Sequence, residues 1–203
     1  MQFDPSKKLT KQFYQIDAVK LAPKLLGKLF FRKVESEYLI GKIVEVEAYR
    51  GRDDEAAHTF NGKTIRNEVM FKEGGYLYVY FTYGMHFCAN VVCGKASEGA
   101  AVLIRGVEPL FGLEKMKLHR FDARVLSDKE IINLTNGPAK FCKAFSISKK
   151  ENGTDLTSSE IFLLDSEDVS KKNIIVTQRI GIKKSVELPW RFYIKDNPYV
   201  SKK

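Results

Sequence analysis

The segment VEVEAY, residues 44–49, holds two carboxylates and a phenol at a spacing that could support acid–base chemistry. Side chains alternate between the two faces of a β-strand, so Glu45, Glu47 and Tyr49 are expected on one face and the valines on the other. The valines can face the core, which would turn the acidic face toward water or a cleft. A solvated edge strand explains this pattern, but a glutamate beside a tyrosine also suits a general base next to a stacking platform.

A second segment, YLYVYFTYGMHFCAN at residues 76–90, is rich in tyrosine. Alternation places three of its phenols on one face of a strand, opposite apolar residues: Tyr76, Tyr78 and Tyr80. Tyr83 and Gly84 are expected to form the turn of a hairpin, so that Tyr83 and Met85 would project from its tip. Tyrosines on a sheet suit single-stranded nucleic acid, where stacking contributes ~1–3 kcal/mol per base. A projecting side chain instead suits the gap left when a base is removed from a duplex.

The other reactive residue types form no pattern typical of metal, nucleotide or serine chemistry. His86 and Cys88 make an H-x-C pair with Cys93 five residues on, whereas zinc sites usually show C-x₂₋₄-C or H-x₃₋₅-H pairs. The sequence contains no G-x-S-x-G, Walker or G-x-G-x-x-G motif. His58, in DEAAHTF, is a lone histidine of the kind that is more often structural than catalytic. We therefore expect no metal and no cofactor.

The composition limits the class of partner. The chain has 203 residues, of which 34 are basic and 25 acidic, for a net charge of +9. This excess favours a polyanion, most simply nucleic acid, or an anionic membrane surface, although a basic housekeeping enzyme explains it equally well. Cys88, Cys93 and Cys142 have no tight spacing and are expected to be reduced and mostly buried. With no signal-peptide pattern and no apolar run of ~20 residues, we expect a cytoplasmic protein that does not enter the membrane.

The elements that must position these residues are strands mixed with a few helices. Helix signals are Asp17 as a cap for residues 17–27, a capping box at SDKE and Pro138 in the first turn of residues 136–145. Pro23 could divide the first of these helices into two turns. Strand-like segments are residues 28–33, 37–49, 76–82, 86–92, 100–110 with an end at Pro109, 160–165, 173–182 and 190–194.

The order of these elements predicts the fold class. Strands and helices do not alternate regularly, which favours an α+β fold around a largely antiparallel sheet over a doubly wound fold. Residues 51–71, GRDDEAAHTFNGKTIRNEVMF, are loop-like and long enough to be functional. We expect one domain over residues 1–203, with residues 1–13 as a loose N-terminal segment.

Four blocks taken together resemble the alkyladenine (methylpurine, 3-methyladenine) DNA glycosylase family. They are VEVEAYRGRDDEAAHTFNGKTIRNEVMF, YLYVYFTYGMHFCANVV, AVLIRGVEPLFG and LTNGPAKFCKAF, and the resemblance extends from about Tyr14 to the RFYIKDNPYVS tail. It implies a curved, partly open barrel-like sheet and a monofunctional, metal-independent enzyme. Such an enzyme excises damaged purines from double-stranded DNA and works as a monomer without a cofactor.

The resemblance also implies roles for individual residues. Glu47 matches the general base that deprotonates a water near C1′ of the extruded nucleotide, and Arg105 matches an arginine near that water and the backbone phosphate. Asn90 matches an asparagine that disfavours guanine through its exocyclic amino group. Three rings would enclose the flipped base: Tyr49, His58 and Tyr80.

At the expected hairpin tip, Tyr83 matches the residue that is inserted into the duplex, and Met85 beside it is a second candidate wedge. Thr82 and His86 depart from the aliphatic residue and the tyrosine of the family pattern, which leaves the lesion preference open. Release of alkylated purines such as 3-methyladenine, with hypoxanthine as a second substrate, is the expected reaction. The alternatives are a non-catalytic single-strand binder that uses the tyrosine face, and a bifunctional glycosylase with a lysine nucleophile.

Overall fold

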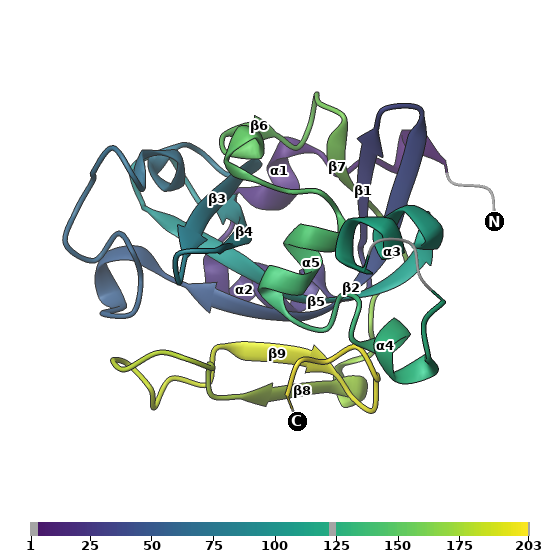
Figure 1. Cartoon of the computed structure of the whole chain (residues 1–203). Helices are drawn as coiled ribbons and strands as arrows, with labels where there is room; N and C mark the ends of the chain where they lie inside the picture. Colours follow the sequence, from purple (N-terminus) through teal and green to yellow (C-terminus); the bar gives the residue numbers. More distant parts are fainter. Residues whose placement is uncertain (1–3, 122–124, 203) are drawn as a thin grey trace.

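The computed structural model describes residues 4–121 and 125–202. Within them the chain forms one nine-stranded sheet in the order β6-β3-β4-β5-β2-β1-β7, with β9 beside β2 and β8 beside β9 (Figure 1). The strand pairings among these residues are antiparallel. The strands are β1 Leu29–Val34, β2 Glu37–Tyr49, β3 Tyr76–Thr82, β4 His86–Cys93, β5 Ala100–Phe111, β6 Thr154–Asp155, β7 Ile161–Leu164, β8 Ile174–Thr177 and β9 Arg191–Ile194.

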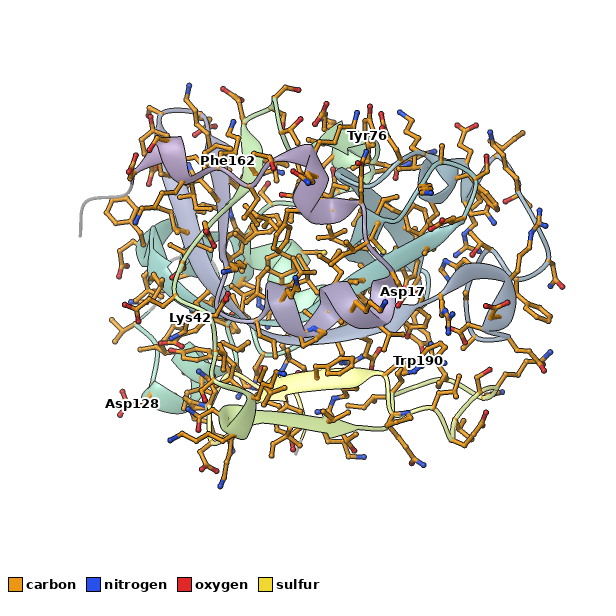
Figure 2. All side chains as sticks on the ribbon, turned by 180° about the vertical axis from the view of Figure 1, so that it is seen from behind. Asp17, Lys42, Tyr76, Asp128, Phe162 and Trp190 are labelled. Atoms are coloured by element: carbon orange, nitrogen blue, oxygen red, sulfur yellow. The ribbon has the colours of Figure 1, made fainter. Side chains whose placement is uncertain are left out.

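The helices are short and lie on both sides of the sheet. Helix α5 packs on β4 and β5 in the front of Figure 1, and α2 packs on β2 at the back, the side that Figure 2 shows. The predicted α+β class with a curved, largely antiparallel sheet is confirmed. The α-helices are α1 Lys11–Tyr14, α2 Ala18–Leu25, α3 Leu113–Phe121, α4 Asp128–Ile132 and α5 Pro138–Ala144, and the 3-10 helices are η1 Pro5–Lys7, η2 Gly51–Asp53, η3 Glu68–Phe71, η4 Lys149–Glu151 and η5 Lys171–Asn173.

Strand β2 organises the sheet because it changes partners along its length. One edge pairs with β5, while the other pairs with β1 up to Lys42 and with β9 from Glu45 to Glu47. The register between β2 and β5 shifts between Ile43 and Val46. Such irregularities bend a strand and re-aim its side chains. The bend of the sheet therefore falls within the VEVEAY segment.

The local helix signals predicted from the sequence are confirmed. The Asp17 carboxylate accepts the N–H groups of Val19 and Lys20 at 2.9 and 3.3 Å, where α2 begins. Gly27, with φ of 86°, follows the end of this helix, and Pro23 does not divide it. The capping box of α4 and the proline at the start of α5 are also present.

Two strand predictions are wrong at their ends. Strand β5 continues past Pro109 to Phe111, because the register with β2 shifts at this point and the missing N–H of proline is accommodated there. Residues 173–182 are not one strand: β8 ends at Thr177, and the chain then forms a long connection to β9. We call residues 178–190 the β8–β9 loop.

The N-terminal segment makes contacts with the edge of the sheet. Residues 1–3 of the expected loose segment lie outside the described residues. From Asp4 onward, the Leu9 N–H donates to Leu163 O at 2.9 Å, and the Asp165 N–H donates to Lys7 O at 2.7 Å. Cys88, Cys93 and Cys142 are buried free thiols, as expected. Among the described residues, none of the helices has the length and apolar character that a bilayer span requires.

Candidate active site

Both glutamates of the VEVEAY segment are fully buried, at 0% exposure. Alternation alone suggests a face turned toward water or a cleft, but strand β9 and Ser201, in the C-terminal segment, cover it. Glu45 accepts hydrogen bonds from Arg105 Nε at 3.0 Å, Arg191 Nε at 2.7 Å and the Ser201 N–H at 2.6 Å. A buried carboxylate requires such partners. Glu45 therefore joins β2 to β5, β9 and the C-terminal segment.

Glu47 has a different set of partners. Its Oε2 accepts from the Tyr49 hydroxyl at 2.9 Å and from Arg105 Nη1 at 3.2 Å, and its Oε1 accepts from the Ile180 N–H at 2.7 Å. Burial alone opposes the charge of Arg105, but Glu47 and Glu45 outweigh it and raise the pKa of Arg105. The guanidinium therefore stays charged between the two carboxylates. We call Glu45, Glu47, Arg105 and Arg191 the carboxylate wall.

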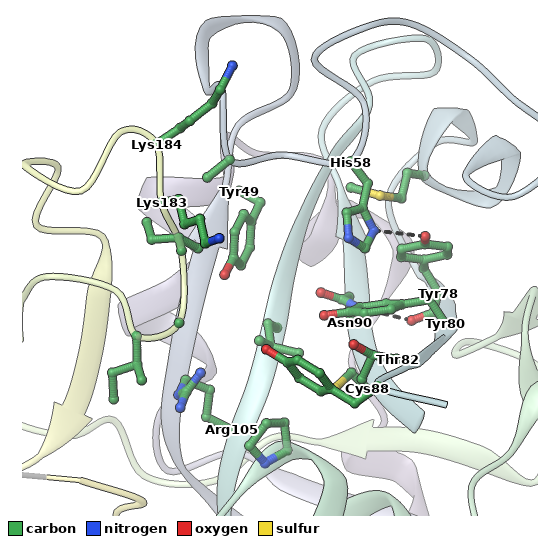
Figure 3. Close-up of a pocket in the computed structure, with 18 of the residues that line it drawn as sticks. Tyr49, His58, Tyr78, Tyr80, Thr82, Cys88, Asn90, Arg105, Lys183 and Lys184 are labelled. Carbon is green, nitrogen blue, oxygen red and sulfur yellow. Dashed lines mark hydrogen bonds between the residues drawn. The ribbon is translucent and has the colours of Figure 1, made fainter. Parts of the chain in front are cut away.

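A cavity of about 470 Å³ opens directly in front of this wall. Glu47 lies behind its lining, but the three residues that donate to the Glu47 carboxylate, Tyr49, Arg105 and Ile180, all line it. Figure 3 shows Tyr49 on one side of the cavity and the histidine and two further tyrosines on the other. The lining also includes His58, Tyr78, Tyr80, Thr82, Tyr83, Cys88, Asn90, Leu103, Lys183 and Lys184.

The rings opposite Tyr49 form an aromatic cluster. Tyr78 and Tyr80 are stacked, with centroids 5.6 Å apart and an interplanar angle of 25°. His58 meets Tyr80 edge-on at 4.5 Å, and its Nδ1 lies 3.1 Å from the Tyr78 hydroxyl. The shared face predicted for the tyrosines is thus present. The alternation pattern grouped Tyr78 with Tyr80, yet the site prediction omitted Tyr78, and this is a residue that the alternation could have identified.

The aromatic cluster is uncharged near neutral pH. Burial raises the pKa of Tyr78 to about 12 and also raises that of Tyr80. Burial, followed by the nearby charge of Glu47, raises the pKa of Tyr49. His58 is exposed overall, but the loss of water where its ring packs, together with Arg66, lowers its pKa. The cavity therefore offers neutral rings and donors beside a buried charge pair.

Asn90 projects into the same cavity from β4. It pairs across the sheet with Tyr78, and its Nδ2 donates to Tyr78 O at 3.2 Å. At 4% exposure, it can meet only what enters the cavity. A fixed carboxamide in such a place can select among ligands by hydrogen bonding.

The β3–β4 hairpin tip, residues 82–86, has the geometry that the sequence predicted. Thr82 pairs with His86, and the Met85 N–H reaches Thr82 O at 3.3 Å. Tyr83 and Gly84 have φ of 50° and 69°, which is typical of the tight turns that join twisted strands. Tyr83 is 84% exposed and Met85 70% exposed. Tyr83 lines the cavity mouth, whereas Met85 lines a separate hollow on the other side of the hairpin.

Comparison with known proteins decides the family. Residues 12–198 match the family described as methylpurine-DNA glycosylase. This chain belongs to the methylpurine-DNA glycosylase family. A relative from Clostridium botulinum is 46% identical over 96% of this chain and 99% of its own length. Relatives from Alkaliphilus oremlandii and Carboxydothermus hydrogenoformans are 45% and 46% identical, over 97% and 96% of this chain and 100% and 99% of their own.

All three relatives carry the name "Putative 3-methyladenine DNA glycosylase". The family membership confirms the resemblance drawn from the four sequence blocks and the expectation of a DNA glycosylase. Family membership alone does not assign roles to the individual residues that line the cavity.

Sequence reasoning missed one side of the glycosylase cavity. The β8–β9 loop supplies Ile180, Lys183 and Lys184 to the lining, and Figure 3 labels the two lysines. The apolar residues around Gly181 predict the continuation of a strand, and this pattern carries no signal that Ile180 lies beside Glu47. Arg66, at the other side of the mouth, donates to Phe81 O at 3.1 Å. The positive charge of Lys183 and Lys184 could have indicated a phosphate-binding site, but lysine is too common in this chain for the pair to stand out.

Proposed function

We propose that this glycosylase is monofunctional and hydrolyses the N-glycosidic bond of alkylated purines such as 3-methyladenine, with hypoxanthine as a second substrate. The observation that carries the proposal is the buried Glu47 carboxylate directly behind a cavity lined by Tyr49, His58 and Tyr80. Alkylation at N3 or N7 gives a purine positive charge, so that it stacks well on electron-rich rings and leaves readily as a neutral base.

The base must leave the duplex to enter this cavity. Extrusion costs a few kcal/mol of stacking and pairing. In this proposal Tyr83, which projects from the hairpin tip beside the cavity mouth, fills the vacated position, and the exposed Met85 is a second candidate wedge. In this proposal Asn90, which lines the cavity, meets the edge of the purine and disfavours guanine through its exocyclic amino group.

Glu47 acts in this proposal as the general base. A carboxylate has about four acceptor positions, and Tyr49, Arg105 and Ile180 take three of them. The remaining position, on Oε1, can accept a proton from a water that approaches C1′ from the cavity. Arg105 stays charged and lies in the lining, where it can hold that water or a backbone phosphate. General-base catalysis typically contributes ~10²–10⁴-fold to a rate.

DNA binding would depend on the rim of the cavity. Arg66, Lys183 and Lys184 line its mouth, and the chain carries a net charge of +9. Phosphate contacts of this kind release counterions, so affinity should fall steeply with salt. The single-strand binder has less support, because Tyr78 is only 1% exposed and cannot act as an open stacking platform.

The test is base release from duplexes that each carry one defined lesion, incubated with the protein in EDTA. The proposal expects free 3-methyladenine or 7-methylguanine and an intact strand with an abasic site. No release from any duplex in the panel would contradict it. A covalent protein–DNA adduct trapped by borohydride would instead indicate a lysine nucleophile and a bifunctional enzyme.

A further inference from the structure

A buried ion pair connects the two loops on either side of Tyr49. Arg179, at the start of the β8–β9 loop, donates from Nη1 to Asp54 Oδ2 at 2.5 Å and from Nη2 to Asp54 Oδ1 at 2.8 Å. Both side chains are 0% exposed. Arg179 does not line the cavity, and it cannot reach a bound base directly. Its effect on the site has to pass through its neighbours.

Those neighbours are parts of the proposed catalytic machinery. Arg179 Nη1 also donates to Ala48 O at 3.0 Å, at the residue between Glu47 and Tyr49. The guanidinium lies over the Tyr49 ring at 4.8 Å and over the Trp190 ring at 5.2 Å. The next residue is Ile180, whose N–H donates to Glu47 at 2.7 Å. One guanidinium therefore fixes the Tyr49 ring, the backbone beside Glu47 and the residue that donates to Oε1.

A role in stability alone is a poor explanation for this pair. Burying two charges costs desolvation energy, and apolar replacements of buried pairs are often neutral or stabilising. Arg179 Nε is also buried without a hydrogen-bond partner. The guanidinium is thus aligned with the Asp54 carboxylate and stacked on the two rings, even though this leaves one donor unsatisfied. The ion pair fixes the orientation of the Arg179 guanidinium.

Asp54 is in turn held by its own loop. Its carboxylate accepts the N–H of Ala56 at 3.1 Å and of Arg50 at 3.4 Å. The bidentate contact thus joins Arg179 to a hydrogen-bonded turn that precedes His58 in the sequence. A lysine could replace the charge of Arg179 but neither the planar fork nor the stacking between two rings.

We propose that Arg179, oriented by Asp54, is a positioning residue for hydrolysis: it sets the Tyr49 hydroxyl and the Ile180 N–H against the Glu47 carboxylate. This inference rests on the proposed function. Loosening the pair should slow the chemical step much more than it weakens DNA binding, because Arg66 at the rim and the hairpin tip belong to other segments of the chain. A shift of about 1 Å in a catalytic group can cost about 10²-fold in rate.

The test uses the double variant Asp54→Asn/Arg179→Gln, which removes both buried charges together and so leaves neither one unpaired. Single-turnover base release is measured on an alkylated duplex, and affinity is measured for a duplex with a tetrahydrofuran abasic-site analogue. We expect release to fall about 10–100-fold and affinity to change less than about 3-fold. The control is Glu160→Gln, which breaks the exposed Lys33–Glu160 pair, neither residue of which lines the cavity, and should leave the rate unchanged.

A combination with Tyr49→Phe separates positioning from general loosening. If Arg179 acts through the Tyr49 hydroxyl, the triple variant should be little slower than the slower of its two parents, because coupled residues are not additive. Full additivity, or release within about 3-fold of wild type in a folded double variant, would overturn the inference. If the double variant does not fold, Trp190→Leu removes one stacking ring and keeps the ion pair, and an unchanged rate there overturns it equally. Release of no base by the wild type would instead refute the proposed function.

Discussion

The carboxylate wall and the hairpin tip of this glycosylase differ sharply in solvent exposure. In the wall, Glu45 and Glu47 are 0% exposed, and five residues from β2, β5, the β8–β9 loop, β9 and the C-terminal segment donate to them: Tyr49, Arg105, Ile180, Arg191 and Ser201. At the tip, Tyr83 is 84% exposed and has a positive φ. Under the proposed function, chemistry and recognition are therefore separated: the general base lies in a buried hydrogen-bond network, and the side chain proposed to enter DNA projects from an exposed turn.

A similar contrast exists inside the wall. Glu45 and Glu47 lie on the same strand, and both are bonded to Arg105. The other partners of Glu45, Arg191 and Ser201, belong to the C-terminal elements, whereas those of Glu47, Tyr49 and Ile180, line the cavity. We therefore expect Glu45 to support the fold and Glu47 to support the reaction.

The largest expected effect concerns the fold. Glu45→Gln removes a carboxylate that compensates two buried arginines, Arg105 and Arg191. Leaving a buried charge without its partner typically costs ~3–5 kcal/mol. Urea unfolding should show this loss, while Glu160→Gln, which breaks the exposed pair with Lys33, should cost less than ~1 kcal/mol. Equal stability losses in the two variants would mean that the wall does not support the fold.

An effect of intermediate size is expected at the tip. Tyr83→Ala should weaken binding to a lesion-containing duplex by ~1–3 kcal/mol, the usual range for aromatic stacking on a base. The free energy of unfolding should stay unchanged, because Tyr83 is 84% exposed. Fluorescence anisotropy with labelled duplex measures the first quantity and urea unfolding the second. Tyr38→Ala, at an exposed tyrosine beside the β1–β2 turn, is the control, and an equal loss of affinity in it would remove the special role of the tip.

The smallest effect concerns pH and His58. Its pKa is lowered in the folded protein from an ordinary value of 6.5, chiefly because the ring loses water. The unfolded chain therefore takes up a proton more readily than the folded one, so stability is full above about 6.5 and is lost as pH falls toward the lowered folded-state value. The wild type should lose more stability between about pH 7 and pH 5 than His58→Asn does. An identical loss in both proteins would show that His58 does not contribute.

The structural features that depend on neighbouring residues along a strand or helix could be predicted from the sequence. Alternation gave the shared face of Tyr78 and Tyr80, and turn chemistry gave the projecting Tyr83. It could not give the burial of Glu45, because that depends on Ser201, 156 residues further along the chain. The same holds for Arg179, whose pair with Asp54 spans 125 residues. Hydrophobic pattern alone continued the strand through Ile180, whereas the buried ion pair holds this segment beside Glu47.

The Glu47→Gln variant tests the central claim most directly. The substituted amide keeps the size of the side chain and can keep one hydrogen-bond acceptor, but it cannot take a proton from water. Binding and single-turnover release are measured on the same 3-methyladenine or 7-methylguanine duplex. We predict that release falls ~10²–10⁴-fold while affinity stays within a few-fold of wild type. Release at the wild-type rate would contradict the role of Glu47 as the general base.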